Sequence, residues 1–182
     1  RDKLVKEARK SMAFLFKHGY GNSGATSGHL IPNYKKIVDH GFKAEYERYE
    51  AMYNALSEED KKGQHGAQLR AMMTCCTMPK ELAEKFSVYC KQCADKVDDP
   101  VRKEELLKMA ENTSKVPWNG ATNFWEAVQS LWMTHMLVMS DENYPGPGVS
   151  FGRIDQYLYP YYRPTLKQTY KHSYSYLGPL LI

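Results

Sequence analysis

The chain has 182 residues, of which 42% are hydrophobic and 25% are charged, and its formal net charge is +4. These proportions are those of ordinary globular proteins and argue against a disordered or fibrous chain. No apolar run is long enough to cross a bilayer, and residues 1–16 lack the pattern of a signal peptide, so no membrane association is expected and a cytoplasmic location is favoured. Basic and acidic residues are interleaved, which indicates solvated helix faces and no nucleic-acid site.

Helical periodicity dominates the first third of the chain. The spacing predicts an amphipathic helix over residues 1–18, which ends before a glycine-rich loop over residues 19–29. A second helical pattern runs from after Pro32 to about residue 56, with apolar residues three and four positions apart. Gly41 lies inside this pattern and is expected to weaken the helix without necessarily ending it.

The helical pattern continues through the middle of the chain. It runs over residues 68–97, where Pro79 predicts a kink or a new helix start. Asp99 and Pro100 form a good N-cap and first-turn pair for the next helix. Thr122 can cap a further helix that is apolar on more than one face, which predicts that residues up to 139 are buried in the complete protein but poorly covered in this chain. Strand-like alternation is scarce, so the fold class is mostly α.

The four cysteines admit two interpretations. Cys90 and Cys93 form a C-x-x-C pair inside a helical stretch, where a spacing of three places both thiols on one face. No second pair stands at zinc-finger spacing and no βαβ pattern surrounds the first, so buried, reduced thiols are favoured. The alternative is a non-catalytic helical binding or scaffold protein with a zinc site that also uses Cys75 and Cys76.

Three stretches of the chain carry a family resemblance. They are GHLIPNYKKIVDHGF at residues 28–42, TNFWEAVQSLWMTHM at residues 122–136 and SFGRIDQYLYPYY at residues 150–162. Together they resemble glycyl radical enzymes of the pyruvate formate-lyase type, and the third stretch is the most specific. The resemblance covers residues 1–165 as a partial pyruvate formate-lyase-like domain, and residues 166–182 depart from it as a divergent tail.

The resemblance implies a ten-stranded α/β barrel wrapped in helices. This chain would supply outer helices and the first barrel strand, near residues 148–153. In that family a radical stored on a glycine passes to a cysteine at the barrel centre, and the thiyl radical abstracts hydrogen from the substrate. Neither a G-C-V-E type cysteine loop nor an R-V-A-G-Y type glycyl motif occurs in this chain. We therefore expect a fragment of the N-terminal half of a radical lyase, inactive alone, with no catalytic residue of its own.

The resemblance also implies what the complete protein needs. A partner, a radical S-adenosylmethionine activating enzyme, would install the glycyl radical, and this chain would itself hold no cofactor and no metal. The full-length form is expected to be a cytoplasmic homodimer that acts on a small-molecule substrate by C–C or C–heteroatom cleavage, as a decarboxylase or a dehydratase.

Two candidate substrate-binding residues lie early in the chain. His29 falls where diol dehydratases contact substrate hydroxyls and where pyruvate formate-lyases carry an arginine, whose bidentate clamp a histidine cannot supply. His29 could equally cap the loop before Pro32. Asn33 replaces an aspartate that is frequent in the family, which makes a cationic substrate such as choline less suitable.

Two further candidates, Pro147 and Gly148, lie where similar diol dehydratases carry His and Ser. Proline has no backbone donor and glycine has no side chain, so neither replaces those hydrogen bonds. We therefore expect small diols to be poor substrates, and arylacetate decarboxylation is one candidate reaction.

Three charged or titratable side chains favour structural roles. Arg153 and Asp155, two positions apart, are expected to belong to a buried or interfacial ion network. His135 lies on the apolar helix and is expected to be a hydrogen-bonded core histidine.

Overall fold

The structure, a computed structural model, describes residues 2–18, 30–141 and 148–164. The labelled helices are α1 (Asp2–His18), α2 (Tyr34–Asn54), α3 (Glu58–Lys62), α4 (Gln64–Ala94), α5 (Pro100–Lys115) and α6 (Phe124–Asp141). Residues 154–164 are helical as well. The described part of the chain contains no strand, so the mostly α prediction is confirmed there.

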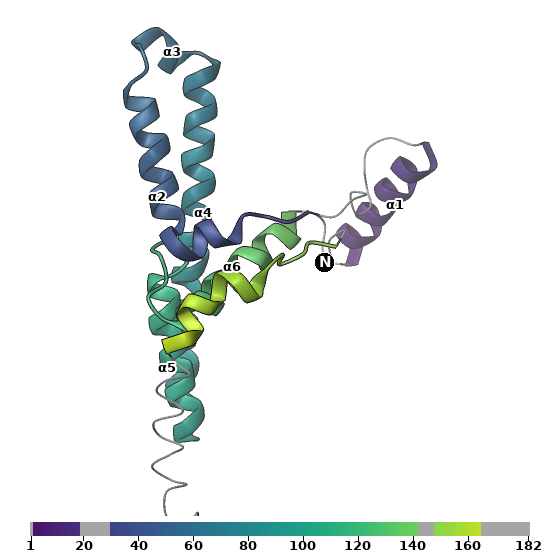
Figure 1. The fold of residues 1–182 in the computed structure, drawn as a ribbon. Coiled ribbons are helices and arrows are strands. Elements are labelled where there is room, and N and C mark those ends of the chain that lie inside the picture. The colour runs from purple at the N-terminus through teal and green to yellow at the C-terminus, as the bar shows by residue number, and fades with distance from the viewer. Residues whose placement is uncertain (1, 19–29, 142–147, 165–182) are drawn as a thin grey trace, which may run out of the picture.

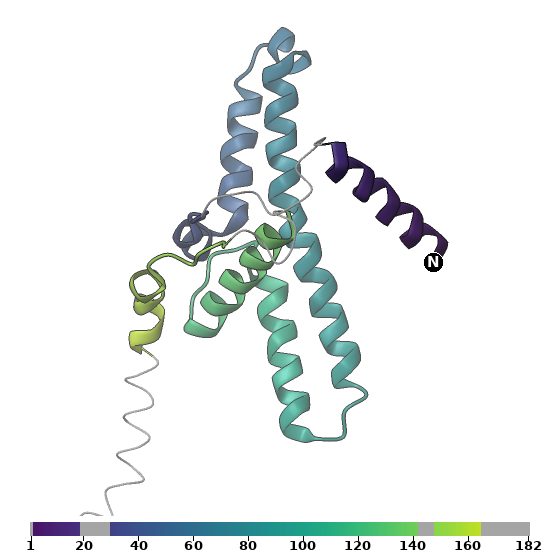
Figure 2. The ribbon, with the colours of Figure 1, turned by 90° about the vertical axis from the view of Figure 1, so that its right-hand side faces the viewer.

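Helix α4 is the central element of the fold, and α2, α3, α5 and α6 contact it (Figure 1). Its first half pairs with α2 to form an arm that carries α3 at its tip, and its second half pairs with α5 (Figure 2). Helix α6 crosses the middle of α4 and contacts α2, α4 and α5. Helix α1 lies apart from the other helices in both views, and its described side chains are exposed.

Two predicted helix boundaries have different outcomes. The predicted start at Asp99 is confirmed, because its carboxylate accepts a hydrogen bond from Val101 N at 2.9 Å and Pro100 stands in the first turn. No new helix starts at Pro79, which lies inside α4. The missing proline amide removes one helical hydrogen bond, yet α4 continues through Pro79 and packs against α2 and α5.

Gly41 interrupts the regular geometry of α2, and the helix continues beyond it, in agreement with the expectation of a weakened helix that need not end there. Its φ of 75° and ψ of 171° are not helical, and the two parts of α2 meet there at a kink. The amides that follow donate outside the helix. Phe42 N donates to Pro117 O at 3.0 Å, and Lys43 N donates to Trp118 O at 2.9 Å. A long-range contact therefore replaces the local hydrogen bonds.

The loop before α6 completes this contact from the other side. Ala121 N donates to Val38 O at 2.8 Å. A Cβ atom on Gly120 would lie 2.2 Å from a carbonyl oxygen of α2, so the two backbones are too close for any side chain at that position. We call these contacts between residues 38–43 and 116–121 the glycine interlock.

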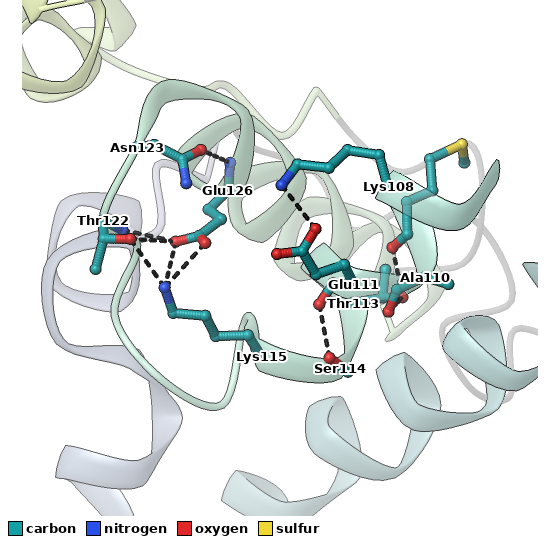
Figure 3. Close-up of polar contacts among 10 residues, drawn as sticks. Lys108, Ala110, Glu111, Thr113, Ser114, Lys115, Thr122, Asn123 and Glu126 are labelled. Atoms are coloured by element: carbon teal, nitrogen blue, oxygen red, sulfur yellow. Dashed lines mark hydrogen bonds and ion pairs between the residues drawn. The ribbon is translucent and has the colours of Figure 1, made fainter. Parts of the chain in front are cut away.

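A buried carboxylate holds the start of α6 (Figure 3). Glu126 accepts hydrogen bonds from Thr122 N at 2.8 Å and Thr122 Oγ1 at 2.9 Å, and its two oxygens lie 2.8 and 2.9 Å from Lys115 Nζ. Asn123 Oδ1 accepts from Glu126 N at 3.0 Å. The side chain that caps α6 is therefore Asn123, and the prediction of Thr122 is wrong by one residue. Thr122 instead ties the preceding loop to the first turn.

The contacts of Glu126 outweigh the effect of its burial. Burial raises the pKa of this carboxyl group, but hydrogen bonds from Lys115 and Thr122 and the charge of Lys115 lower it, and the net pKa of Glu126 is below its usual value. The pKa in the folded state is thus below that in the unfolded state. The carboxylate therefore stabilises the fold above the unfolded pKa, and this contribution is lost as the pH falls through the folded pKa.

The substitution Gly41→Ala is expected to lower the free energy of unfolding by about 2–4 kcal/mol. Its Cβ would lie 2.2 Å from Trp118 O, at a positive φ that side chains rarely adopt. Urea denaturation followed by circular dichroism measures the loss. Gly63→Ala is the matched control, because φ there is −82° and the nearest atom would lie at 3.4 Å. A loss below about 1 kcal/mol is expected for the control, and equal losses would contradict the interlock.

The substitution Glu126→Gln is expected to flatten the acid side of the pH dependence of stability. Between about pH 5 and pH 3, the free energy of unfolding should fall less steeply for this variant than for the unchanged chain, because the amide does not titrate. Urea denaturation across that range measures both slopes. Glu111→Gln is the control, since Glu111 forms a more exposed ion pair with Lys108 at 2.8 Å. Identical slopes for Glu126→Gln and the unchanged chain would contradict the prediction.

Candidate functional site

The four predicted substrate-binding residues fall on two parts of the chain. His29 and Pro147 lie outside the described residues. Asn33 is exposed, and its side-chain oxygen caps α2 by accepting a hydrogen bond from Lys36 N at 3.3 Å. Gly148 is exposed and has a φ of 91°, a conformation that favours glycine. Substrate binding by these residues stays a prediction.

The structure brings together the segments that carry Asn33 and Gly148. Ser150 N donates to Leu30 O at 2.9 Å, which joins the two backbones. The two segments also lie close together at Gly152, where an added Cβ atom would be 2.9 Å from the Ile31 side chain. We call residues 30–33 and 148–152 the paired segments.

The predicted barrel strand near residues 148–153 is wrong for the described structure. These residues are neither strand nor helix, although the backbone hydrogen bond from Ser150 N to Leu30 O joins them to the earlier segment. A strand needs a ladder of such bonds to a neighbouring strand. The described residues offer no such neighbour.

A buried aromatic cluster adjoins the paired segments. His135 Nδ1 lies 2.7 Å from Tyr34 Oη, and both residues are at least 95% buried, with exposed fractions of 5% and 2%. The Phe151 ring lies against both, with its centroid 4.1 Å from that of His135 and 6.0 Å from that of Tyr34. The prediction that His135 is a hydrogen-bonded core histidine is confirmed.

Burial keeps the two polar rings of the cluster uncharged. It lowers the pKa of His135, and together with nearby Tyr157 it raises the pKa of Tyr34 to about 12. At neutral pH the imidazole is therefore neutral and the phenol keeps its proton. The Tyr34 hydroxyl can donate to His135 Nδ1 when the imidazole proton is on Nε2. The arrangement suits a fixed structural hydrogen bond better than proton transfer to solvent.

Two tyrosines that sequence reasoning did not single out hold the helical residues 154–164 against this cluster. Tyr157 Oη donates to Phe151 O at 2.9 Å, and Tyr161 Oη donates to Asp39 at 2.9 Å. Their spacing of four places them on one helix face, which is the signal that could have found them.

Arg153 and Asp155 form an ion pair, and of the predicted buried or interfacial placement, burial is not found among the described residues. The guanidinium contacts both carboxylate oxygens, at 2.9 and 2.7 Å. The side chains are 68% and 63% exposed. Arg153 directly precedes the helical residues 154–164 and Asp155 lies in their first turn, and no described residue buries either side chain.

The cysteines do not assemble into a metal site. All lie on α4, and Cys75 and Cys90 are separated by about 20 Å along its axis at about 1.5 Å per residue. In the described ranges no group of three or more His, Cys, Asp or Glu residues could hold a metal ion. Cys76 and Cys90 are buried, and burial raises the pKa of their thiols, whereas Cys75 is exposed and Cys93 is half-buried, so the predicted burial is confirmed for Cys76 and Cys90.

None of the described helices has the length and apolar character to cross a membrane.

Comparison with known proteins points to one family. The family model for pyruvate formate lyase-like proteins matches residues 2–172. Isethionate sulfite-lyase from Desulfovibrio desulfuricans is 39% identical over 136 residues, which are 73% of this chain and 16% of that protein. Indoleacetate decarboxylase from Tractidigestivibacter scatoligenes is 40% identical over 84 residues, which are 46% of this chain and 9% of that protein.

Solved structures agree with these matches. A glycyl radical enzyme from Archaeoglobus fulgidus superimposes with a TM-score of 0.70 and 31% identity over 80% of this chain and 18% of that protein. Other similar structures are dehydratases that act on glycerol, 1,2-propanediol and hydroxyproline. The chain thus spans less than a fifth of the length of the proteins it matches. Because the family model covers nearly the whole chain, this chain belongs to the pyruvate formate lyase-like family of glycyl radical enzymes.

Proposed function

We propose that this chain is an N-terminal helical part of a longer glycyl radical lyase that cleaves a C–C or C–heteroatom bond. The observation that carries the proposal is the family match over residues 2–172 in a chain that covers only 16% of the sulfite-lyase and 18% of the Archaeoglobus enzyme. The names of the two relatives denote loss of a heteroatom group and loss of carbon dioxide, so both kinds of cleavage occur among similar proteins.

In that reaction, this chain would help to orient the reacting groups and to shield them. It lacks both radical-carrying motifs, and its cysteines lie along α4 and not on a loop. The remainder of the protein would therefore carry the glycyl radical, which an activating enzyme of the radical S-adenosylmethionine type would install. This chain would present the paired segments, with Asn33 and Gly148, to the substrate.

We further propose a substrate that is larger than a small diol or bears a carboxylate, with arylacetate decarboxylation as the candidate. Two observations favour it. Gly148 has no side chain that could bind a substrate hydroxyl, and Asn33 has no charge that would attract a cation. The 40% identity to indoleacetate decarboxylase supports the same choice. The longer match to isethionate sulfite-lyase favours a C–heteroatom lyase as the second candidate.

The scaffold alternative with zinc at the cysteines lacks support. The described cysteines are spread along one helix, and no cluster of metal-binding residues occurs in the described ranges. Metal analysis of the purified chain tests it, because stoichiometric zinc would favour this alternative.

The isolated chain is expected to show no glycyl radical and no lyase turnover. Electron paramagnetic resonance after anaerobic incubation with an activating enzyme should show no glycyl doublet, because the glycyl motif is absent. The full-length enzyme serves as the positive control under the same conditions. A doublet localised to this chain would overturn the proposed division of roles.

The full-length activated enzyme is expected to prefer arylacetates or isethionate over small diols. The assay compares turnover of a panel of arylacetates, isethionate, choline, glycerol and propanediol at equal radical content. Efficient turnover of glycerol or propanediol would contradict the proposed substrate class. Turnover of isethionate alone would select the second candidate.

The chain alone is also expected to self-associate through α6. Trp125 and Trp132 are 51% and 52% exposed, and together with Val128 they lie on one helix face at spacings of three and four. An uncovered apolar patch favours association. Sedimentation velocity at micromolar concentration should show oligomers, and Trp125→Gln with Trp132→Gln should reduce them. Met52→Gln, on the arm, is the control. A compact monomer of the unchanged chain would contradict the expectation.

A further inference from the structure

We propose that His135 is a positioning residue that holds the paired segments in register and thereby sets where Asn33 and Gly148 face the substrate. The inference rests on the proposed function for its consequence in catalysis. Its structural part, that one buried imidazole fixes two segments, stands on the contacts of His135 alone.

His135 contacts the second segment directly and the first segment through the residue that follows it. Tyr34, which directly follows Asn33, lies 2.7 Å from His135 Nδ1 through its hydroxyl. Phe151, which lies in the second segment with Gly148, packs its ring against the imidazole with a centroid separation of 4.1 Å and an interplanar angle of 35°. The backbone bond from Ser150 N to Leu30 O, which joins the two segments, lies one residue from Phe151. The imidazole is thus the common support of both.

The support is itself fixed. His135 lies on α6, whose first turn is held by the contacts of Glu126 with Lys115 and Thr122. The two turns of α6 before His135 are packed in the core, where Ala127 and Leu131 are buried. A side chain on a packed helix positions its neighbours more closely than one on a loop.

Histidine meets two requirements at once. The buried Tyr34 hydroxyl needs an acceptor, because a buried donor without a partner is unfavourable. The Phe151 ring needs a flat apolar surface against which to pack. Phenylalanine at position 135 would supply the surface without the acceptor, and asparagine would supply an acceptor near the position of Nδ1 without the ring. The two substitutions therefore separate the two requirements.

The first test measures the register of the segments in this chain. Hydrogen exchange of the Ser150 amide, followed by NMR, is expected to be at least about tenfold faster in Tyr34→Phe and His135→Phe, and intermediate in His135→Asn. The Ala121 amide, bonded to Val38 O in the glycine interlock, reports general loss of stability and should change less. Tyr161→Phe is the matched control, because it removes a tyrosine hydrogen bond to Asp39 and leaves the His135 contacts in place.

A spectroscopic signature accompanies this exchange. The ¹⁵N shift of His135 Nδ1 is expected to be that of an acceptor nitrogen in the unchanged chain and to move in Tyr34→Phe. Unchanged Ser150 exchange in Tyr34→Phe and His135→Phe, or equal acceleration of Ser150 and Ala121, would overturn the proposal.

The second test uses the full-length activated enzyme. In His135→Phe, kcat/KM is expected to fall at least about tenfold with most of the change in KM, at unchanged radical content per protein, and His135→Asn should recover part of it. A loss confined to radical content, or unaltered kcat/KM, would overturn the role in substrate positioning. If the unchanged enzyme turns over none of the panel, the proposed function fails, and the exchange measurement alone decides whether His135 fixes the segments.

Discussion

The glycine interlock is the contact on which the rest of the described fold depends. At Gly41 the chain leaves helical geometry, and its next two amides donate to the loop before α6 instead of to their own helix. Because the backbones approach this closely, the side chains on either side are drawn into one core. Its buried members are Tyr34, Val38, Val116, Ala121, Ala127, Leu131, Tyr157 and Leu158. They come from residues 34–38, 116–131 and 157–158, so the interlock is where local helices become a tertiary structure.

Helix α6 follows the glycine interlock in the chain and supports the aromatic cluster. Its first turn carries a buried carboxylate that is tolerated because an ammonium group and two donors of Thr122 surround it. Two turns further on, the same helix presents a neutral imidazole to the aromatic cluster. The polar groups of α6 therefore have different tasks. Glu126 fixes the helix to the loop, and His135 fixes the paired segments to the helix.

The sequence predicts the structural features that depend on neighbouring residues. It misses those that depend on residues far away along the chain. The helices and the start at Asp99 follow from apolar spacing and from a cap within two residues. The break at Gly41 depends on carbonyls more than seventy positions away, so propensity alone underestimates it. The candidate site divides in the same way. His135 is recognisable as a core histidine from its apolar helix, but its partner Tyr34 is 101 positions away, and the strand expected near residues 148–153 depends on neighbours that the described residues do not supply.

Helix α4 has a mechanical consequence for the whole shape. The arm with α2 and the pair with α5 are both built on this one continuous helix, which changes direction between them in Figure 2. Pro79 stands at the midpoint of the helix, where one hydrogen bond is already missing and bending stiffness is lowest. The tip of the arm lies about 22 Å along the axis from this point, so a bend of about 10° there displaces the tip by about 4 Å. A change of packing around Pro79 that bent α4 would therefore move α3 further than it moved the helix at the proline.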